Sequence, residues 1–131
     1  MIDKQSVFNA VVAHSRAQPS KAMEFSACRY RTNDGKRCFI GALVPDELYD
    51  PGMECGSVQK KLTYDTEYAM LGSQNHKFFE VLTKMFGTLD SEELELLRDL
   101  QNVHDNYDVE FWEQQLERVS RLYKLAFPKQ A

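Results

Sequence analysis

The chain has 131 residues and a formal net charge of −4, with 43% apolar and 27% charged residues. These proportions are ordinary for a globular protein, and the length suits one domain with a substantial core, so we predict a single domain over residues 1–131. No apolar run approaches the roughly 18–20 residues of a membrane span, and the N-terminus lacks the apolar core of a signal peptide. Three cysteines at irregular spacing argue against a disulfide framework. We therefore expect a cytoplasmic protein that does not bind a membrane.

The charge is distributed unevenly along the chain. Residues 21–40 carry five basic and two acidic side chains, a net charge of +3. Residues 90–117 carry ten acidic side chains and one arginine, a net charge of −9. Such a chain favours electrostatic contacts, either within its own fold or with partners.

The first predicted element is a helix. Asp3 can cap it, and four apolar residues at helical spacing form a narrow stripe: Val7, Phe8, Val11 and Val12. Pro19 is expected to end this helix.

A β-hairpin is predicted around residues 27–40. Asn33-Asp34-Gly35 lies between two short alternating runs, and a three-residue loop would place Gly35 in the left-handed conformation. That register puts one set of side chains towards the core: Cys28, Tyr30, Cys38 and Ile40. The other face carries Arg29, Arg31, Arg37 and Phe39.

This register has an electrostatic consequence. It places Arg31 directly opposite Arg37, where like charges destabilise a strand pair by roughly 0.2–1 kcal/mol, so we expect an anionic group nearby. A two-residue loop at Asp34-Gly35 would instead mix the two faces.

Short helical segments are predicted between the hairpin and the C-terminal half. Residues 45–49 read as one helical turn that Pro51 and Gly52 stop. Ser57 could cap a short helix over residues 58–62, and Asp65 another over residues 66–71.

Three longer helices follow, which with the first helix should form the core. The first begins at Ser73, has the apolar stripe Phe78, Val81, Leu82, Met85 and Phe86, and ends at Gly87. The second begins with a capping box of Asp90 and Glu93 and should bury Leu94, Leu97, Leu100 and Val103. The third follows Asp108, with Trp112, Leu116, Val119 and Tyr123 on one face, Leu122 and Ala126 beside it, and Pro128 as its stop. The predicted class is α+β, mostly helical, with four or more helices, a helical bundle over residues 73–127 and the hairpin packed on one side.

Two segments resemble a group of small proteins encoded by tailed phages and prophages. The first is Tyr30-Arg31, Gly35 and Cys38-x-x-Gly41-x-Leu43-Val44-Pro45-Asp46; the second is Leu100-Gln101-x-x-His104-Asp105, followed by a Trp-containing last helix that ends in Tyr123-x-Leu125. The resemblance spans most of the chain. It implies an accessory protein of a bacterial virus or mobile element, working in the host cytoplasm, where such proteins often bind and block a host enzyme.

Cysteine and histidine offer two candidate sites. Cys28, Cys38 and Cys55 could form a zinc site with His14, His76 or His104, but the Cys-x-x-Cys pair typical of a structural zinc site is absent from the sequence. Cys38, beside Arg37, is the best candidate for a nucleophile, although the predicted register points it inward. We therefore expect buried cysteines and no metal.

His104-Asp105 invites comparison with metal-dependent phosphohydrolases. Those sites need several more histidines and carboxylates, and this chain has three histidines. A histidine in the last turn of a helix that bonds to a neighbouring backbone group explains His104 better. With no glycine-rich phosphate loop either, we predict a protein that is not an enzyme and needs no cofactor.

Two charged surfaces remain as candidate binding sites. Arg29, Arg31, Lys36 and Arg37, with Lys21, could contact phosphates, or these residues could pair with the acidic helices of the same domain. Glu92, Glu95 and Asp99 lie three and four residues apart on one side of a helix, and Asp108, Glu110, Glu113 and Glu117 continue the charge.

The acidic surface is the preferred candidate. It is either a solvated face or a surface for a host protein with a basic surface, such as a nucleic-acid-handling enzyme of a defence system. A small nucleic-acid- or nucleotide-binding module that uses the basic hairpin is the alternative.

Overall fold

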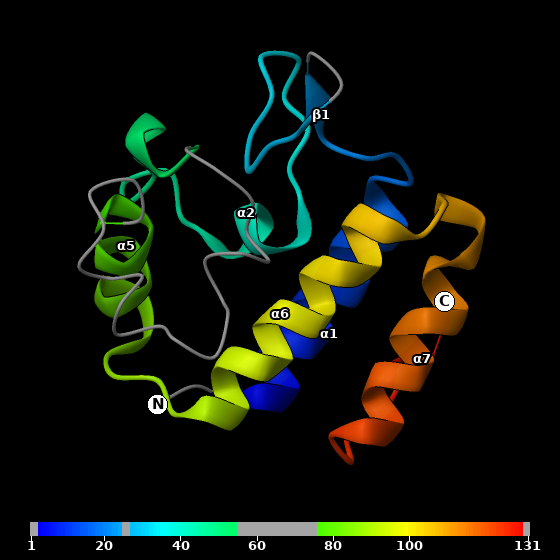
Figure 1. Ribbon diagram of the computed structural model, residues 1–131. Helices are drawn as coiled ribbons and strands as arrows, with labels where there is room; N and C mark the ends of the chain where they lie inside the picture. Colours follow the sequence, from blue (N-terminus) through cyan, green and yellow to red (C-terminus); the bar gives the residue numbers. More distant parts are fainter. Residues whose placement is uncertain (1–2, 25–26, 55–75, 130–131) are drawn as a thin grey trace.

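The computed structural model describes residues 3–24, 27–54 and 76–129, and these are mostly helical (Figure 1). The α-helices are α1 (Lys4–Ala17), α2 (Phe39–Leu43), α5 (His76–Phe86), α6 (Ser91–Asn106) and α7 (Trp112–Leu122). The described residues also form two 3-10 turns, η1 (Pro51–Glu54) and η2 (Val109–Phe111). The short helices predicted over residues 58–62 and 66–71 lie outside the described residues.

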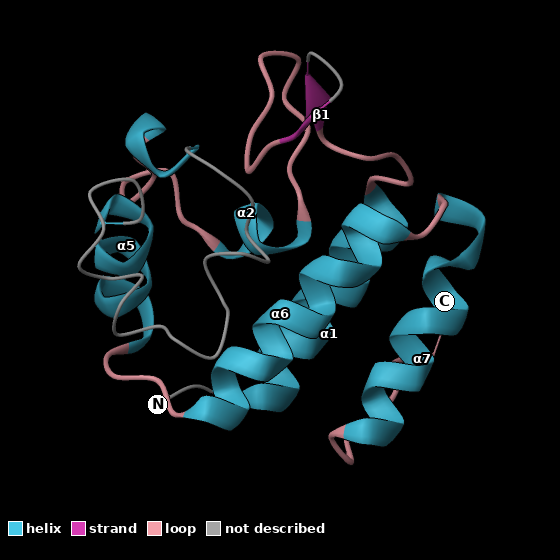
Figure 2. Ribbon diagram, viewed as in Figure 1, coloured by secondary structure: helices cyan, strands magenta, loops and turns pink. Residues whose placement is uncertain are grey.

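The β-hairpin predicted over residues 27–40 is wrong, and with it the α+β class. Among the described residues, strand pairing is confined to β1 (Met23–Glu24) and β2 (Ala27–Cys28), two residues each, and to one isolated bridge between Arg31 and Arg37 (Figure 2). Helices hold 62% of the described residues. The second half of the predicted hairpin is instead the start of α2, whose N-cap is Cys38.

Burial explains why α2 replaces a strand. Phe39, predicted on the outer face with the arginines, is fully buried together with Ile40. Two consecutive buried side chains cannot lie on one face of a strand, but a short helix can bury both. The tight turn before α2 does form, since Gly35 has a φ of +87° and its N–H donates to the Thr32 carbonyl.

The helix caps follow the sequence closely. The Asp3 carboxylate accepts from the backbone N–H groups of Gln5 and Ser6 at the start of α1. Asp90 and Glu93 form the predicted capping box at the start of α6. Asp108, in contrast, makes no side-chain capping bond, and a 3-10 turn separates it from α7.

The core lies where α1, α2, α6 and α7 meet, with α5 beside them (Figure 1). α6 buries Leu96, Leu97, Leu100 and Val103. Leu94, predicted among these, is only partly buried, because it lies towards α5 at the edge of the core. α7 buries Trp112, Leu116 and Val119 against the same core.

The C-terminal end of α7 is a Schellman motif built on a lysine. Lys124 has a φ of +57°, and the Leu125 N–H donates to the Ser120 carbonyl at 2.8 Å. α7 therefore ends at Leu122, well before Pro128. The turn sends the chain back along α1, where Phe127 packs against Phe8 and the Pro128 carbonyl accepts from Arg16.

We expect Lys124→Gly to raise the free energy of unfolding by about 0.5–1 kcal/mol, because glycine adopts positive φ without steric cost. Urea unfolding followed by circular dichroism measures this change. Lys124→Ala, which removes the same charge but keeps the steric cost, is the control and should give no gain. If both variants raise the free energy of unfolding equally, the gain comes from removing the charge and not from the backbone conformation.

Candidate functional site

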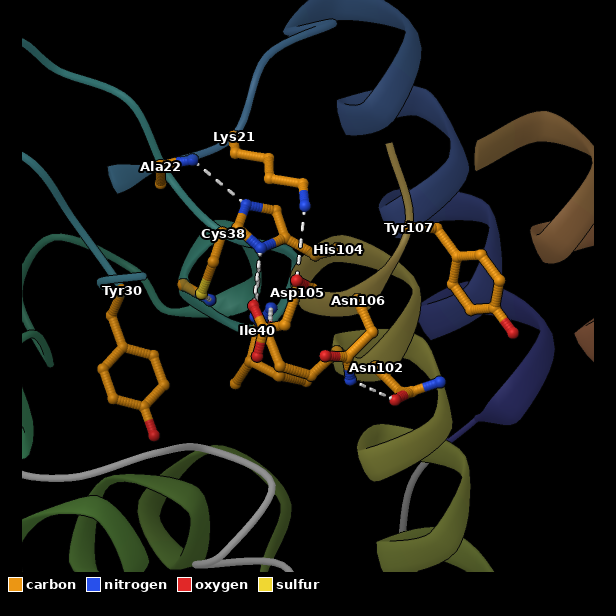
Figure 3. Close-up of polar contacts among 12 residues, drawn as sticks. Lys21, Ala22, Tyr30, Cys38, Ile40, Asn102, His104, Asp105, Asn106 and Tyr107 are labelled. Atoms are coloured by element: carbon orange, nitrogen blue, oxygen red, sulfur yellow. Dashed lines mark hydrogen bonds and ion pairs between the residues drawn. The ribbon is translucent and has the colours of Figure 1, made fainter. Parts of the chain in front are cut away.

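His104 in the last turn of α6 belongs to a buried polar cluster (Figure 3). Its side chain is fully buried, and its Nε2 accepts from the Ala22 N–H at 3.1 Å. Its Nδ1 lies 2.7 Å from an Asp105 carboxylate oxygen. A backbone N–H can only donate, so Nε2 is the acceptor and Nδ1 carries the proton that it donates to Asp105.

Gln101 extends this cluster to α2. Its Oε1 accepts from the Ile40 N–H at the start of α2, and its Nε2 donates to Asp105 at 2.8 Å. Lys21 donates to the Asp105 carbonyl at 3.2 Å. The Leu-Gln-x-x-His-Asp segment therefore ties α6 to α2 and to the chain before β1.

These bonds give the His104-Asp105 pair a structural role. A histidine acts as a general base through a nitrogen that faces the reacting group. The Nε2 of His104 is instead occupied by backbone, and its ring is held between Trp112, stacked at 5.5 Å, and Phe39, edge-on at 5.3 Å. His104 does bond to backbone, but its partner is Ala22, 82 residues away, and not a neighbouring group at the helix end as the sequence predicted.

Cys38 is equally occupied by a structural bond. Its Sγ accepts from the Gly41 N–H at 3.2 Å as the N-cap of α2, and it is 1% exposed. Burial raises the pKa of the Cys38 thiol, which disfavours the thiolate that a nucleophile or metal ligand needs.

Only some of the other residues considered as zinc ligands lie among the described residues. Cys55 lies outside the described residues. His14 donates from Nε2 to the Arg37 carbonyl at 2.8 Å, which joins α1 to the residue before α2. Among the described residues, no three His, Cys, Asp or Glu side chains are grouped so that they could hold a metal ion.

The anion expected beside Arg31 and Arg37 is a carboxylate of the same chain. Asp46 lies 2.9 Å from Arg31 and 3.0 Å from Arg37. Arg31 also donates to the Val44 carbonyl at 2.8 Å, and its guanidinium lies 4.4 Å from the centre of the Tyr49 ring. The motif from Tyr30 to Asp46 is thus held together by its own members.

The remaining cations of the predicted anion site have partners as well. Arg29 lies 3.7 Å from the Glu54 carboxylate, and Lys36 lies 3.7 Å from Asp34. The arginines were expected to pair with the acidic helices, but in the described contacts their carboxylates come from Asp46 and Glu54. These contacts argue against a phosphate-binding surface here.

The predicted acidic face lines a shallow groove between α6 and the end of α7. Three of its lining side chains are Glu92, Glu95 and Asp99, and the α7 side supplies Leu122 and Tyr123. The groove has a volume of about 480 Å³. Leu122 is 60% exposed, the largest exposure of any large apolar side chain among the described residues.

Comparisons with known protein families, with characterised proteins and with solved structures give no match for this chain. Among the described residues, no helix has the length and apolar character that crossing a bilayer requires.

Asp99 and Tyr123 set the groove's geometry. The Tyr123 hydroxyl donates to the Asp99 carboxylate at 2.6 Å, and burial together with that acceptor raises the pKa of the Tyr123 hydroxyl. The bond fixes the end of α7 against α6. The tyrosine therefore stays protonated, and the net charge of the groove comes from its carboxylates.

The other predicted acidic residues lie elsewhere. Glu113 forms two bonds to Arg16 of α1, at 2.7 and 3.1 Å, and so serves the fold. Glu110 is exposed in η2, at the opposite end of α7 from the groove. Lys4 lies 2.9 Å from Glu92 at the rim, which leaves Glu95 and Asp99 as the carboxylates nearer the middle of α6.

Sequence reasoning missed Leu122 as part of this site. It was expected beside the core face of α7, but it lies one residue before Tyr123, off the buried line of Leu116 and Val119, and is exposed to solvent. An apolar residue between Arg121 and Tyr123, off the main stripe, was the available signal.

Proposed function

We propose that this protein binds another protein, and that the groove between α6 and α7 receives a lysine- or arginine-rich segment of that partner. One observation carries the proposal: three carboxylates share a groove with a leucine that is 60% exposed. Interfaces gain orientation and association rate from charge and gain affinity from buried apolar anchors, and this groove offers both.

Rigid presentation supports the same role. The carboxylates lie on a helix whose start is capped by Asp90 and Glu93 and whose far end is held by the His104 cluster. Side chains on such a helix lose less entropy on binding than those of a flexible tail. The phage-type resemblance adds a setting: an accessory protein of a bacterial virus, acting in the host cytoplasm on an enzyme that handles nucleic acid. A groove lined with carboxylates suits the basic channel of such an enzyme.

The bonds of His104 and Cys38 support a binding function without catalysis. His104 and Cys38 are both buried, and each accepts a hydrogen bond from a backbone N–H. Stoichiometric binding requires neither of them, and no cofactor enters the proposal.

The test compares two triple variants with the same change in charge. Glu92→Gln, Glu95→Gln and Asp99→Asn together remove the groove carboxylates and keep side-chain shape. Glu47→Gln, Asp108→Asn and Glu110→Gln together remove three exposed carboxylates that do not line the groove. The partner is captured from host lysate with the wild-type protein, identified and purified, and association rates are then measured by surface plasmon resonance over a salt series.

We expect the groove variant to associate at least several-fold more slowly than the wild type and with a weaker salt dependence. The control should stay within about twofold of the wild-type rate, since distant charges are screened within roughly 10 Å. Equal losses in both variants would show that net charge alone matters. A groove variant that binds like the wild type would reduce the acidic face to a solvated surface.

A further inference from the structure

A second hollow lies on the other side of α6. Its apolar lining consists of Phe79, Leu82, Leu89 and Leu94. Thr83 and Thr88 also line it and are exposed, so they form its polar rim. Phe79 and Leu82 are nearly fully buried, whereas Leu89 and Leu94 are partly exposed. Leu94 is the residue that the helical pattern predicted for the core, and its side chain faces this pocket.

The size of the pocket restricts what it can hold. Its volume is about 240 Å³, below the roughly 300–1,000 Å³ of small-molecule sites. One large apolar side chain of leucine or phenylalanine size suits this volume.

The pocket and the acidic groove flank the same turn of α6. Leu94 lines the pocket and the next residue, Glu95, lines the groove. Figure 1 shows α6 between α5, on the pocket side, and α7, on the groove side. Ser91 and Glu95 are exposed on the surface of α6. A segment that crosses the start of α6 can therefore contact both hollows.

We propose that the pocket receives an apolar side chain of the same basic segment that the groove binds, an inference that rests on the proposed function. Charge selects this occupant. The groove carboxylates favour a cationic segment, and the pocket mouth includes Gly87 at the C-terminal end of α5, where the helix dipole also favours positive charge. The anchor supplies the buried apolar contact that the charged groove lacks on its α6 side.

Helix dimensions set the spacing that such a segment needs. An α-helix with its side chains is about 10–12 Å across, and an extended chain advances about 3.3 Å per residue. The apolar residue and the basic residues of the partner should therefore be separated by roughly four positions in an extended segment.

The experiment uses two fluorescent nine-residue peptides and the whole protein. One peptide carries a leucine four residues before a Lys-Arg-Lys run, with glycine and serine elsewhere, and the other has alanine in place of the leucine. Binding is measured by fluorescence anisotropy at low salt. Two variants fill the pocket from its rim, Thr83→Trp and Thr88→Trp, and Gln114→Trp on the exposed side of α7 is the control for an added indole.

We expect the leucine peptide to bind the wild type about tenfold more tightly than the alanine peptide, as burial of one large apolar side chain implies. Both rim variants should lower the affinity for the leucine peptide to that for the alanine peptide, while Gln114→Trp leaves the preference intact. The groove triple variant should bind both peptides several-fold more weakly than the wild type does.

Three results would overturn the inference. Equal affinity of the wild type for the two peptides means that the pocket holds no partner anchor. A leucine preference that survives in both rim variants places the anchor elsewhere. In either of these cases, weaker binding by the groove variant leaves the proposed function standing. If the groove variant binds both peptides like the wild type, the proposed function and the inference fail together.

Discussion

Gly41→Ala is expected to lower the free energy of unfolding by about 3 kcal/mol, because the new methyl group has no space. A Cβ at this position would lie 2.1 Å from the Tyr30 carbonyl oxygen and 2.8 Å from its carbonyl carbon. Both atoms belong to the backbone, which cannot rotate away as a side chain can. The alanine therefore forces α2 away from the segment that precedes the tight turn.

Displacing α2 would disturb several buried contacts at once. The Cys38 N–H donates to the Tyr30 carbonyl at 3.2 Å, and the Gly41 N–H donates to the Cys38 sulfur. Phe39 and Ile40, both fully buried, move with the helix. Urea unfolding of the variant followed by circular dichroism measures the loss.

Gly35→Ala is the matched control for Gly41→Ala. Gly35 has a φ of +87° and no atom within 4 Å of its added Cβ, so only backbone conformation changes, at a cost of roughly 1–2 kcal/mol. If the two variants lose similar free energies of unfolding, then the close approach of Gly41 to the Tyr30 backbone is not the reason for glycine at position 41.

The sequence predicted the features that local chemistry decides. The caps at Asp3 and at Asp90 with Glu93, and the left-handed Gly35, each depend on a few neighbouring residues. Helical spacing likewise located the buried faces of α1 and α7. These elements would form similar caps and stripes in many folds, so no tertiary knowledge was needed.

The wrong predictions came from contacts between distant segments. The segment from Cys38 to Ile40 follows a strong turn signal and is predicted to be a strand, but Gln101, 61 residues after Ile40, accepts from the Ile40 N–H and stabilises a helix start. Phe39 is buried because His104 and Trp112 surround it. Local propensity carries no information about such partners.

The candidate site was predictable only as far as it depends on local spacing along one helix. Glu92, Glu95 and Asp99 were correctly placed on one side of a helix by their spacing. The groove itself requires α7 to lie beside α6, with Tyr123 bonded to Asp99 across 24 residues of chain. The anion expected near Arg31 and Arg37 was identified only by the fold, which supplies Asp46.

Glu54→Leu is expected to destabilise the protein by about 3–5 kcal/mol, since it removes a buried carboxylate that four groups share. Glu54 accepts from the backbone N–H groups of Tyr30 and Arg31, at 2.9 and 3.0 Å, and from the Tyr49 hydroxyl at 2.6 Å. Arg29 lies 3.7 Å away, and only 7% of the Glu54 side chain is exposed. Leucine fills similar space but accepts no hydrogen bond, so buried donors lose their partner.

The exposure of the side chain distinguishes Glu54 from Asp46, the other carboxylate that pairs with these arginines. Asp46 also bridges two arginines, but its side chain is 77% exposed, so Asp46→Asn should cost less than about 1 kcal/mol. Glu54→Gln keeps one acceptor oxygen and should lie between the two. The free energies of unfolding from urea titrations rank the three variants. If Glu54→Leu costs no more than Asp46→Asn, then Glu54 does not hold the residues from Tyr30 to Tyr49 in place.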